Sequence, residues 1–193
     1  MKRLILAAAL AAIAAPALAH TGQGTTSGLV HGLAHPILGL DHLLAMLAVG
    51  LWSGFVLPAR VWGGAAAFMS AMVAGAGLSW SGVPIPGVEG LIAASVLVFG
   101  VLTVFAHAGQ SRGLTLASLA AIAGFGLCHG HAHATEATGQ AAAYLAGFLI
   151  ATGALHLVGI GLARAVSRLR SAGVLRKAAG AGIAASGAWL VSG

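Results

Sequence analysis

Charged side chains are scarce in this sequence: they make up 6% of its 193 residues, and Asp and Glu together occur three times. Hydrophobic residues make up 59% of the chain, which also contains 30 glycines. Since a soluble globular domain carries about 25% charged residues, this composition excludes that class and indicates an integral membrane protein. We expect no nucleic-acid partner, because the basic residues are dispersed between apolar runs and form no patch with interleaved aromatics.

The sequence also lacks a second cysteine and a phosphate-binding loop. Cysteine occurs once, as Cys128, so no internal disulfide can form and the thiol content says nothing about the compartment. The chain also contains no GxxxxGK(S/T) phosphate-binding loop, which excludes ATP hydrolysis by that route.

The first nineteen residues have the pattern of a cleaved secretory signal, with two basic residues, a short apolar stretch and the small-residue exit ALA. We predict that residues 1–19 are a signal peptide and that residues 20–193 form the mature protein, with His20 at a periplasmic N-terminus. A first transmembrane anchor is the alternative, but the apolar stretch is short and ends in small residues.

Six apolar runs follow the signal segment. Each approaches the ~20 residues that a helix needs to cross ~30 Å of hydrocarbon, and a lipid environment favours helices because their backbone polar groups are satisfied internally. The predicted fold class is therefore all-α integral membrane, a single domain with a six-transmembrane-helix bundle after a cleaved N-terminal signal peptide. The runs cover residues 29–52, 61–80, 90–107, 114–130, 140–162 and 177–192.

Loop charge predicts the direction of these helices across the membrane. Cytoplasmic loops are enriched in Lys and Arg, and every basic residue of the mature chain falls in or beside alternate loops. The expected cytoplasmic loops are residues 53–60, 108–113 and 163–176, and the expected outer loops are residues 81–89 and 131–139. The signal segment and the loop charge both place the mature N-terminus outside a bacterial inner (plasma) membrane.

The first candidate site is the stretch HPILGLDHLLAM, residues 35–46, which places polar side chains inside an apolar run. An ionisable residue at this depth costs on the order of 2.5 to 3.5 kcal/mol, so it usually faces the bundle interior and serves function. On an ideal straight helix His31, His35, His42 and Met46 fall within a sector of about 60°. Asp41 lies to one side, where its carboxylate can orient His42 or complete a site.

Pro36 decides whether these groups act together. In a straight helix His35 and His42 are ~10 Å apart along the axis, too far to hold one ion. Pro36 leaves the Gly32 carbonyl without its helical donor and, with Gly39, favours a kink like those of transporters with broken helices. His35 and the Asp41-His42 pair therefore either close on one ion or act as successive stations.

The second candidate site is CHGHAHATE, residues 128–136. On a helix His129, His133 and Glu136 form one stripe, while His131 points to the other side. A His/His/Glu set at this spacing suits a divalent first-row metal. We expect this stripe to adjoin the first cluster in the folded bundle, because each set alone leaves an ion partly coordinated and lipid cannot complete the shell.

Several other residues are weaker candidates for the metal route. Glu89, at the start of the third run, is included as a ligand, although a carboxylate at a helix N-terminus also favours the helix dipole. His156 is either an exit ligand or a packed histidine bonded to a backbone carbonyl. The pattern leaves open whether His31 or the N-terminal His20 takes part.

The two motifs, within HPILGLDHLLAMLAVGLW and CHGHAHATE, resemble the signatures of the HupE/UreJ family of bacterial nickel and cobalt permeases, which are similarly small, often signal-bearing and of about six helices. The resemblance implies uptake of Ni²⁺ or Co²⁺ for metalloenzymes such as hydrogenase or urease. Two positions depart from the family pattern, with Cys128 where phenylalanine is usual and Ala134 where glycine is usual, which bears on metal preference or local backbone shape. The motif positions that match are His35, Asp41, His42, His129, His133 and Glu136.

The resulting hypothesis is an inner-membrane permease for divalent nickel or cobalt that works by facilitated diffusion. Its partners are the metal ion and the lipid bilayer, it needs no prosthetic group, it is not an enzyme, and a homo-oligomer is compatible with the sequence. The alternatives are an intramembrane metalloenzyme that uses the His/Asp/Glu set for catalysis, a b-type haem protein, and a metal sensor or structural partner. The sequence does not rank nickel over cobalt and does not show how transport is coupled to energy.

Overall fold

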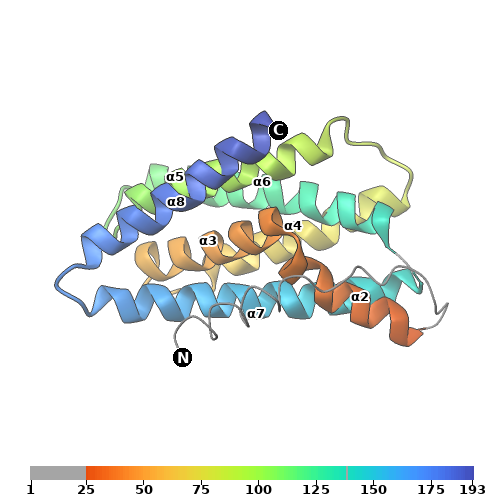
Figure 1. The fold of residues 1–193 in the computed structure, drawn as a ribbon, viewed down its shortest axis with the longest axis horizontal. Coiled ribbons are helices and arrows are strands. Elements are labelled where there is room, and N and C mark those ends of the chain that lie inside the picture. Colours follow the sequence, from red (N-terminus) through yellow and green to blue (C-terminus); the bar gives the residue numbers. More distant parts are fainter. Residues whose placement is uncertain (1–24, 138) are drawn as a thin grey trace, which may run out of the picture.

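The computed structural model describes residues 25–137 and 139–193, which form an all-helical bundle (Figure 1). Within these ranges there are helices and no strands, so the predicted all-α class is confirmed. The predicted signal peptide, residues 1–19, and His20 lie outside the described residues. The helices are α2 (Thr25–Leu38), α3 (Leu40–Val56), α4 (Gly63–Trp80), α5 (Val88–Phe105), α6 (Arg112–Glu136), α7 (Ala141–Ser167) and α8 (Ala172–Ser192).

The helices pack in pairs that run the length of the bundle. α4 packs along α6, α5 along α8, and both α2 and α3 along α7 (Figure 1). Consecutive helices from α3 to α8 run in opposite directions, so the connections fall at two ends. We call the end that carries α2 and the loops 81–87 and 137–140 the α2 end, and the other the opposite end.

Glycine allows these helices to approach closely beside the candidate site. Gly130 of α6 lies against the backbone of Met72 in α4, and a Cβ there would collide with the Met72 carbonyl oxygen. Lipid provides no hydrophobic force between helices, so such small-residue contacts let the backbones pack and hold the pair together. Gly130 thereby fixes the position of its neighbour His129 against α4.

The helices are those of a multi-pass membrane protein, but fewer qualify as spans than the sequence predicted. α5, α6 and α7 are long and apolar enough to cross a membrane, and the bent pair α2–α3 makes a fourth if it is one span. α4 is rich in Gly, Ala and Ser, and α8 carries Arg176 and Lys177 in its first two turns, which lowers their mean hydropathy. Each predicted run nevertheless overlaps a helix, and the first run overlaps two.

Two predicted loops are shorter than expected because their flanking helices continue. α6 extends to Glu136, so most of the expected outer loop 131–139 is helical. Its histidine-rich final turns remain helical because His129, His131 and His133 are buried among neighbouring helices. At the opposite end the expected loop 163–176 reduces to the short connection between α7 and α8.

Charge is segregated between the two ends of the bundle. The three acidic residues of the chain, Asp41, Glu89 and Glu136, lie at the α2 end. The basic residues after position 20 all lie at the opposite end, in its loops or the adjoining helix turns: Arg60, Arg112, Arg164, Arg168, Arg170, Arg176 and Lys177. The α2 end is therefore the part of the structure suited to a cation.

Candidate metal site

A break between α2 and α3 places two of the predicted residues face to face. The helices meet at Gly39, which has an extended backbone (φ −80°, ψ 117°), and they are bent by 77°. Pro36 lies in the last turn of α2 and cannot donate a backbone hydrogen bond to Gly32. The bend brings the ring centroids of His35 and His42 to 5.3 Å. The two histidines therefore lie at one place and are not separated by two helical turns.

The same break corrects the expectation that four residues share one face of a straight helix. Met46, which lies on α3 with His42, is fully buried in the hydrophobic core. His31 lies on α2 and lines a cavity at the α2 end. The expected single face is wrong because a straight-helix projection does not apply across a 77° bend.

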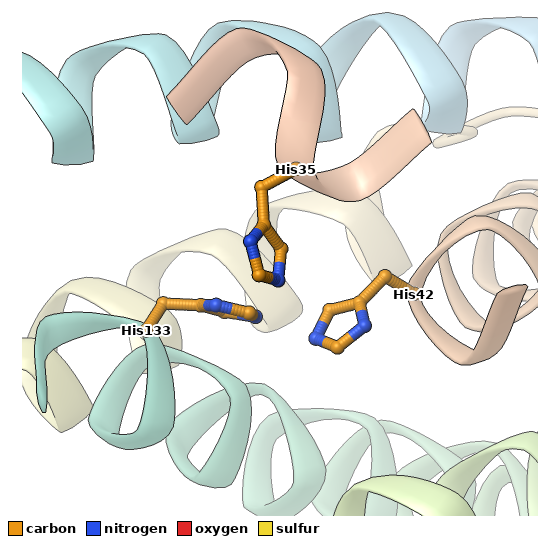
Figure 2. Close-up of side chains that lie close together, drawn as sticks. All are labelled: His35, His42 and His133. Atoms are coloured by element: carbon orange, nitrogen blue, oxygen red, sulfur yellow. The ribbon is translucent and has the colours of Figure 1, made fainter. Parts of the chain in front are cut away.

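His133 of α6 completes a group of three histidines with His35 and His42. Ligand nitrogens of these three side chains lie within 4.8 Å of one another, and Figure 2 shows the rings, carried by three helices, converging on a common centre. The ring centroid of His133 is 4.6 Å from that of His35 and 4.4 Å from that of His42. Metal–imidazole bonds are about 2.0–2.1 Å, so small side-chain rotations would bring three nitrogens onto one ion.

The ring nitrogens of this group are poorly satisfied without an ion. Within residues 25–137 and 139–193, both nitrogens of His133 and the Nε2 of His42 are buried and have no hydrogen-bond partner. Leaving such groups unpaired in a buried site costs about 1–3 kcal/mol each. The donor set therefore fits a divalent metal that takes nitrogen ligands.

Asp41 fixes the orientation of His42. Its Oδ1 accepts a hydrogen bond from the His42 backbone N–H at 2.8 Å and lies 2.6 Å from the ring Nδ1. When Nδ1–H donates to the carboxylate, Nε2 keeps its lone pair for a metal, the arrangement found in carboxylate–histidine–metal sites. Asp41 thus acts through His42 and also places negative charge beside the site.

Glu136 brings a second carboxylate to the histidines from the end of α6. Its Oε2 is 3.6 Å from Nδ1 of His133 and 3.9 Å from Nε2 of His35, and 48% of its side chain is exposed. Glu136 and His35 line a cavity of about 600 Å³ together with His31 and Tyr144. The cavity therefore reaches the group of three at His35, whereas His42 and His133 are not among its lining residues.

His129 lies behind the three histidines on the same stripe of α6. It is fully buried, and its ring centroid is 5.0 Å from that of His42. Its Nε2 lies 3.1 Å from the hydroxyl of Ser95 in α5, whose own proton goes to the Ile92 carbonyl. His129 therefore adjoins the group of three but does not belong to it.

Two other residues behave differently from the cluster. His131 turns away from the stripe, as the helical projection indicated, and its Nε2 lies 2.7 Å from the Val83 carbonyl oxygen in the loop between α4 and α5. Glu89 is exposed in the first turn of α5 and interacts electrostatically with Glu136, His42 and Asp41. In the described ranges it has no hydrogen bond or ion pair to the histidines, so the structure does not bring it into the group.

Sequence reasoning missed the residues that α5 and α7 contribute. Phe148 of α7 has its ring centroid 4.0 Å from that of His133, and Tyr144 lies one turn earlier and lines the cavity. Ser95 of α5 holds His129. Aromatic and hydroxyl side chains inside apolar runs give no pattern that separates these positions from ordinary packing residues.

Comparison with known proteins assigns the chain to a family. Residues 8–190 match the family described as HupE / UreJ protein. The chain belongs to the HupE/UreJ family. It is also 39% identical over 197 residues to Protein HupE of Rhizobium leguminosarum bv. viciae, and the alignment covers the whole of both chains. No solved structure matches the chain. The resemblance drawn from the two motifs is thereby confirmed.

Proposed function

We propose that this protein is a permease that takes up a divalent metal ion, Ni²⁺ or Co²⁺, through its α2 end. The observation that carries the proposal is the group His35, His42 and His133, whose ligand nitrogens converge below an open cavity. Imidazole suits nickel, as it also suits zinc, copper and iron. Membership of the HupE/UreJ family supports the choice of these metals and a role in supplying metalloenzymes such as hydrogenase or urease.

The capture of the ion follows from the charge of the cavity. Glu136 presents a half-exposed carboxylate where a hydrated cation first meets the protein. The three imidazoles then replace water, and Asp41, held against His42, offsets the charge that the low-dielectric interior would otherwise penalise. His129 lies behind the histidines, and Glu89, at the start of α5, interacts electrostatically with Glu136 and Asp41.

The orientation in the membrane follows from the segregation of charge. Basic residues concentrate in cytoplasmic loops, so we place the opposite end in the cytoplasm and the α2 end in the periplasm, across the bacterial inner membrane. α4 and α8, of 18 and 21 residues, lie alongside α6 and α5 and would cross with them, which gives six passes. The signal segment would be removed, which leaves the mature N-terminus outside.

Facilitated diffusion is the simplest mechanism for such a protein. The metal is cargo and not a resident cofactor, so we assign no enzymatic activity. Imidazole binds metal only in its neutral form, so uptake should fall as the external medium is acidified.

Uptake of radioactive nickel by cells that lack their own nickel transporters tests the proposal. Cells with the wild-type protein should accumulate nickel, cobalt should compete better than zinc or copper, and His133→Ala should reduce the initial rate at least tenfold. His107→Ala is the matched control, because His107 is exposed near the opposite end. Nickel accumulation no greater than in cells without the protein would contradict the proposal.

A further inference from the structure

His156 is a second buried histidine site that the three-histidine group does not use. It lies just past the middle of α7, a helix of 27 residues, and 1% of its surface is exposed. Its Nδ1 lies 2.8 Å from the Met46 carbonyl oxygen, so this nitrogen donates and Nε2 keeps its lone pair. In the part of the chain that the structure describes, Nε2 is buried without a hydrogen-bond partner.

A second polar atom in the same condition lies one turn away. The hydroxyl of Thr152, four residues before His156, is fully buried and has no partner within the described ranges. Residues four apart share one face of a helix. Buried hydroxyl and imidazole groups normally have hydrogen-bond partners. An unpaired nitrogen and an unpaired oxygen on one face of α7 together indicate a binding site for an electron-pair acceptor, such as a metal ion.

A row of rings connects this site to the three histidines. The centroid of His42 is 5.0 Å from that of His129, and His129 is 5.2 Å from Phe68 of α4. Phe68 is in turn 5.3 Å from His156. Phe68 therefore contacts both buried histidines, and His156 is the next imidazole after His129 along this row.

We propose that Nε2 of His156 and Oγ1 of Thr152 form an inner binding site for the transported divalent metal ion, reached from His129 past Phe68. The inference rests on the permease function proposed above. An imidazole with its Nδ1–H held by a carbonyl is the tautomer that ligates metals, and water molecules carried with the ion would complete its coordination.

The inner site differs from the outer one in charge. All three acidic residues of the chain lie at the α2 end, so no carboxylate belongs to the His156 site. A neutral site binds a dication more weakly than one that contains Asp41 and Glu136. Conduction requires sites that bind strongly enough to admit the ion and weakly enough to release it, and an outer charged site followed by an inner neutral one meets this requirement.

Two substitutions separate ligation from packing at His156. His156→Asn places an amide N–H near the position of Nδ1, so it preserves the donor to Met46 and removes the ligand nitrogen. His156→Gln places its amide at the depth of Nε2 and loses the donor to Met46. The proposal predicts that both variants transport nickel at least tenfold more slowly than wild type in proteoliposomes at equal protein abundance. A purely structural histidine would be replaced well by Asn and poorly by Gln.

Nickel binding to the purified full-length protein provides the second readout. The outer-site affinity of His156→Asn should stay within about twofold of wild type while its transport rate falls, because the outer ligands are untouched. Thr152→Val should slow transport several-fold, whereas the control Thr103→Val, whose buried hydroxyl is bonded to the Phe99 carbonyl, should not. If neither His156 variant accumulates in the membrane, the comparison of Thr152→Val with Thr103→Val still tests the inner site.

Three results would overturn the inner site. These are a wild-type transport rate in His156→Asn, a parallel loss of outer-site binding and transport in that variant, or equal transport by Thr152→Val and Thr103→Val. If the wild-type protein itself moves no nickel into vesicles, the permease function has failed, and that outcome is distinct from all three.

Discussion

Asp41 and His42 are adjacent in sequence and joined in space: Oδ1 of Asp41 lies 2.6 Å from Nδ1 of His42. The contact leaves Nε2 of His42 as the nitrogen available to a metal, and that atom has no other partner among the described residues. A backbone hydrogen bond from His42 to the same carboxylate oxygen holds the pair in place. The other two histidines of the group, His35 and His133, come to His42 from α2 and α6.

The first prediction concerns this carboxylate. Asp41→Asn keeps the size of the side chain and one oxygen acceptor but removes the negative charge. We expect nickel affinity to fall by about 10–100-fold, the usual cost of losing such a supporting partner, with the protein inserted at normal abundance. Equilibrium nickel binding and immunoblotting measure the two quantities. Unchanged affinity across external nickel concentrations would show that the pair is structural.

The second prediction separates the histidines of α6. His133→Ala and His129→Ala should abolish most nickel uptake, because the first removes a ligand nitrogen and the second lies directly behind the site. His131→Ala should leave much of the uptake, since His131 faces the Val83 carbonyl. Initial rates at matched abundance test this, and an equal loss in all three would contradict the assigned directions of these side chains.

The third prediction concerns the bend between α2 and α3. Pro36→Ala restores a backbone donor for the Gly32 carbonyl and favours a straighter helix, which would move His35 away from His42. If His35 and His42 bind the same ion, uptake should fall at least tenfold. A smaller decrease would be expected if the two histidines were separate binding sites that the ion visits in turn. Pro58→Ala, in the loop between α3 and α4, is the control and should transport normally. Wild-type transport by Pro36→Ala would show that the 77° bend does not depend on proline.

The fourth prediction concerns the packing of α6 on α4. A Cβ at Gly130 would collide with the Met72 carbonyl oxygen, whereas a Cβ at Gly124 on the same helix meets nothing within 4 Å. Gly130→Ala should therefore lower the free energy of unfolding by about 1–3 kcal/mol, the usual cost of overpacking, and Gly124→Ala should not. Thermal unfolding in detergent compares the two variants. Equal midpoints would mean that the helices separate easily at this position.

Much of the site follows from local patterns that do not depend on the fold. Helical spacing placed His129, His133 and Glu136 on one stripe and turned His131 away, and adjacency in sequence suggested that Asp41 orients His42. The need to complete an ion's shell away from lipid predicted that the two motifs would adjoin, which the ring contacts between His42 and the α6 histidines confirm. Metal binding by these residues stays a prediction.

The rest depends on tertiary packing that no local pattern encodes. Pro36 and Gly39 indicated a break, but not the size or direction of the bend. These depend on how α2 packs along α7, and they place His35 beside His42 while separating His31 from Met46. Tyr144, Phe148 and Ser95 look like packing residues in sequence. The start of the predicted loop 131–139 was placed too early, because the polar last turns of α6 have the low hydropathy of a loop although they are helical and buried.

X-ray absorption spectroscopy at the nickel edge of the purified, nickel-loaded protein tests the central claim most directly. The arrangement of His35, His42 and His133 predicts about three imidazole nitrogens at on the order of 2 Å from the ion in the wild-type protein. His133→Ala, loaded at higher nickel concentration, should show one imidazole fewer. A shell of oxygen ligands alone, or an imidazole count that does not change in His133→Ala, would contradict the claim that these three histidines hold the transported metal.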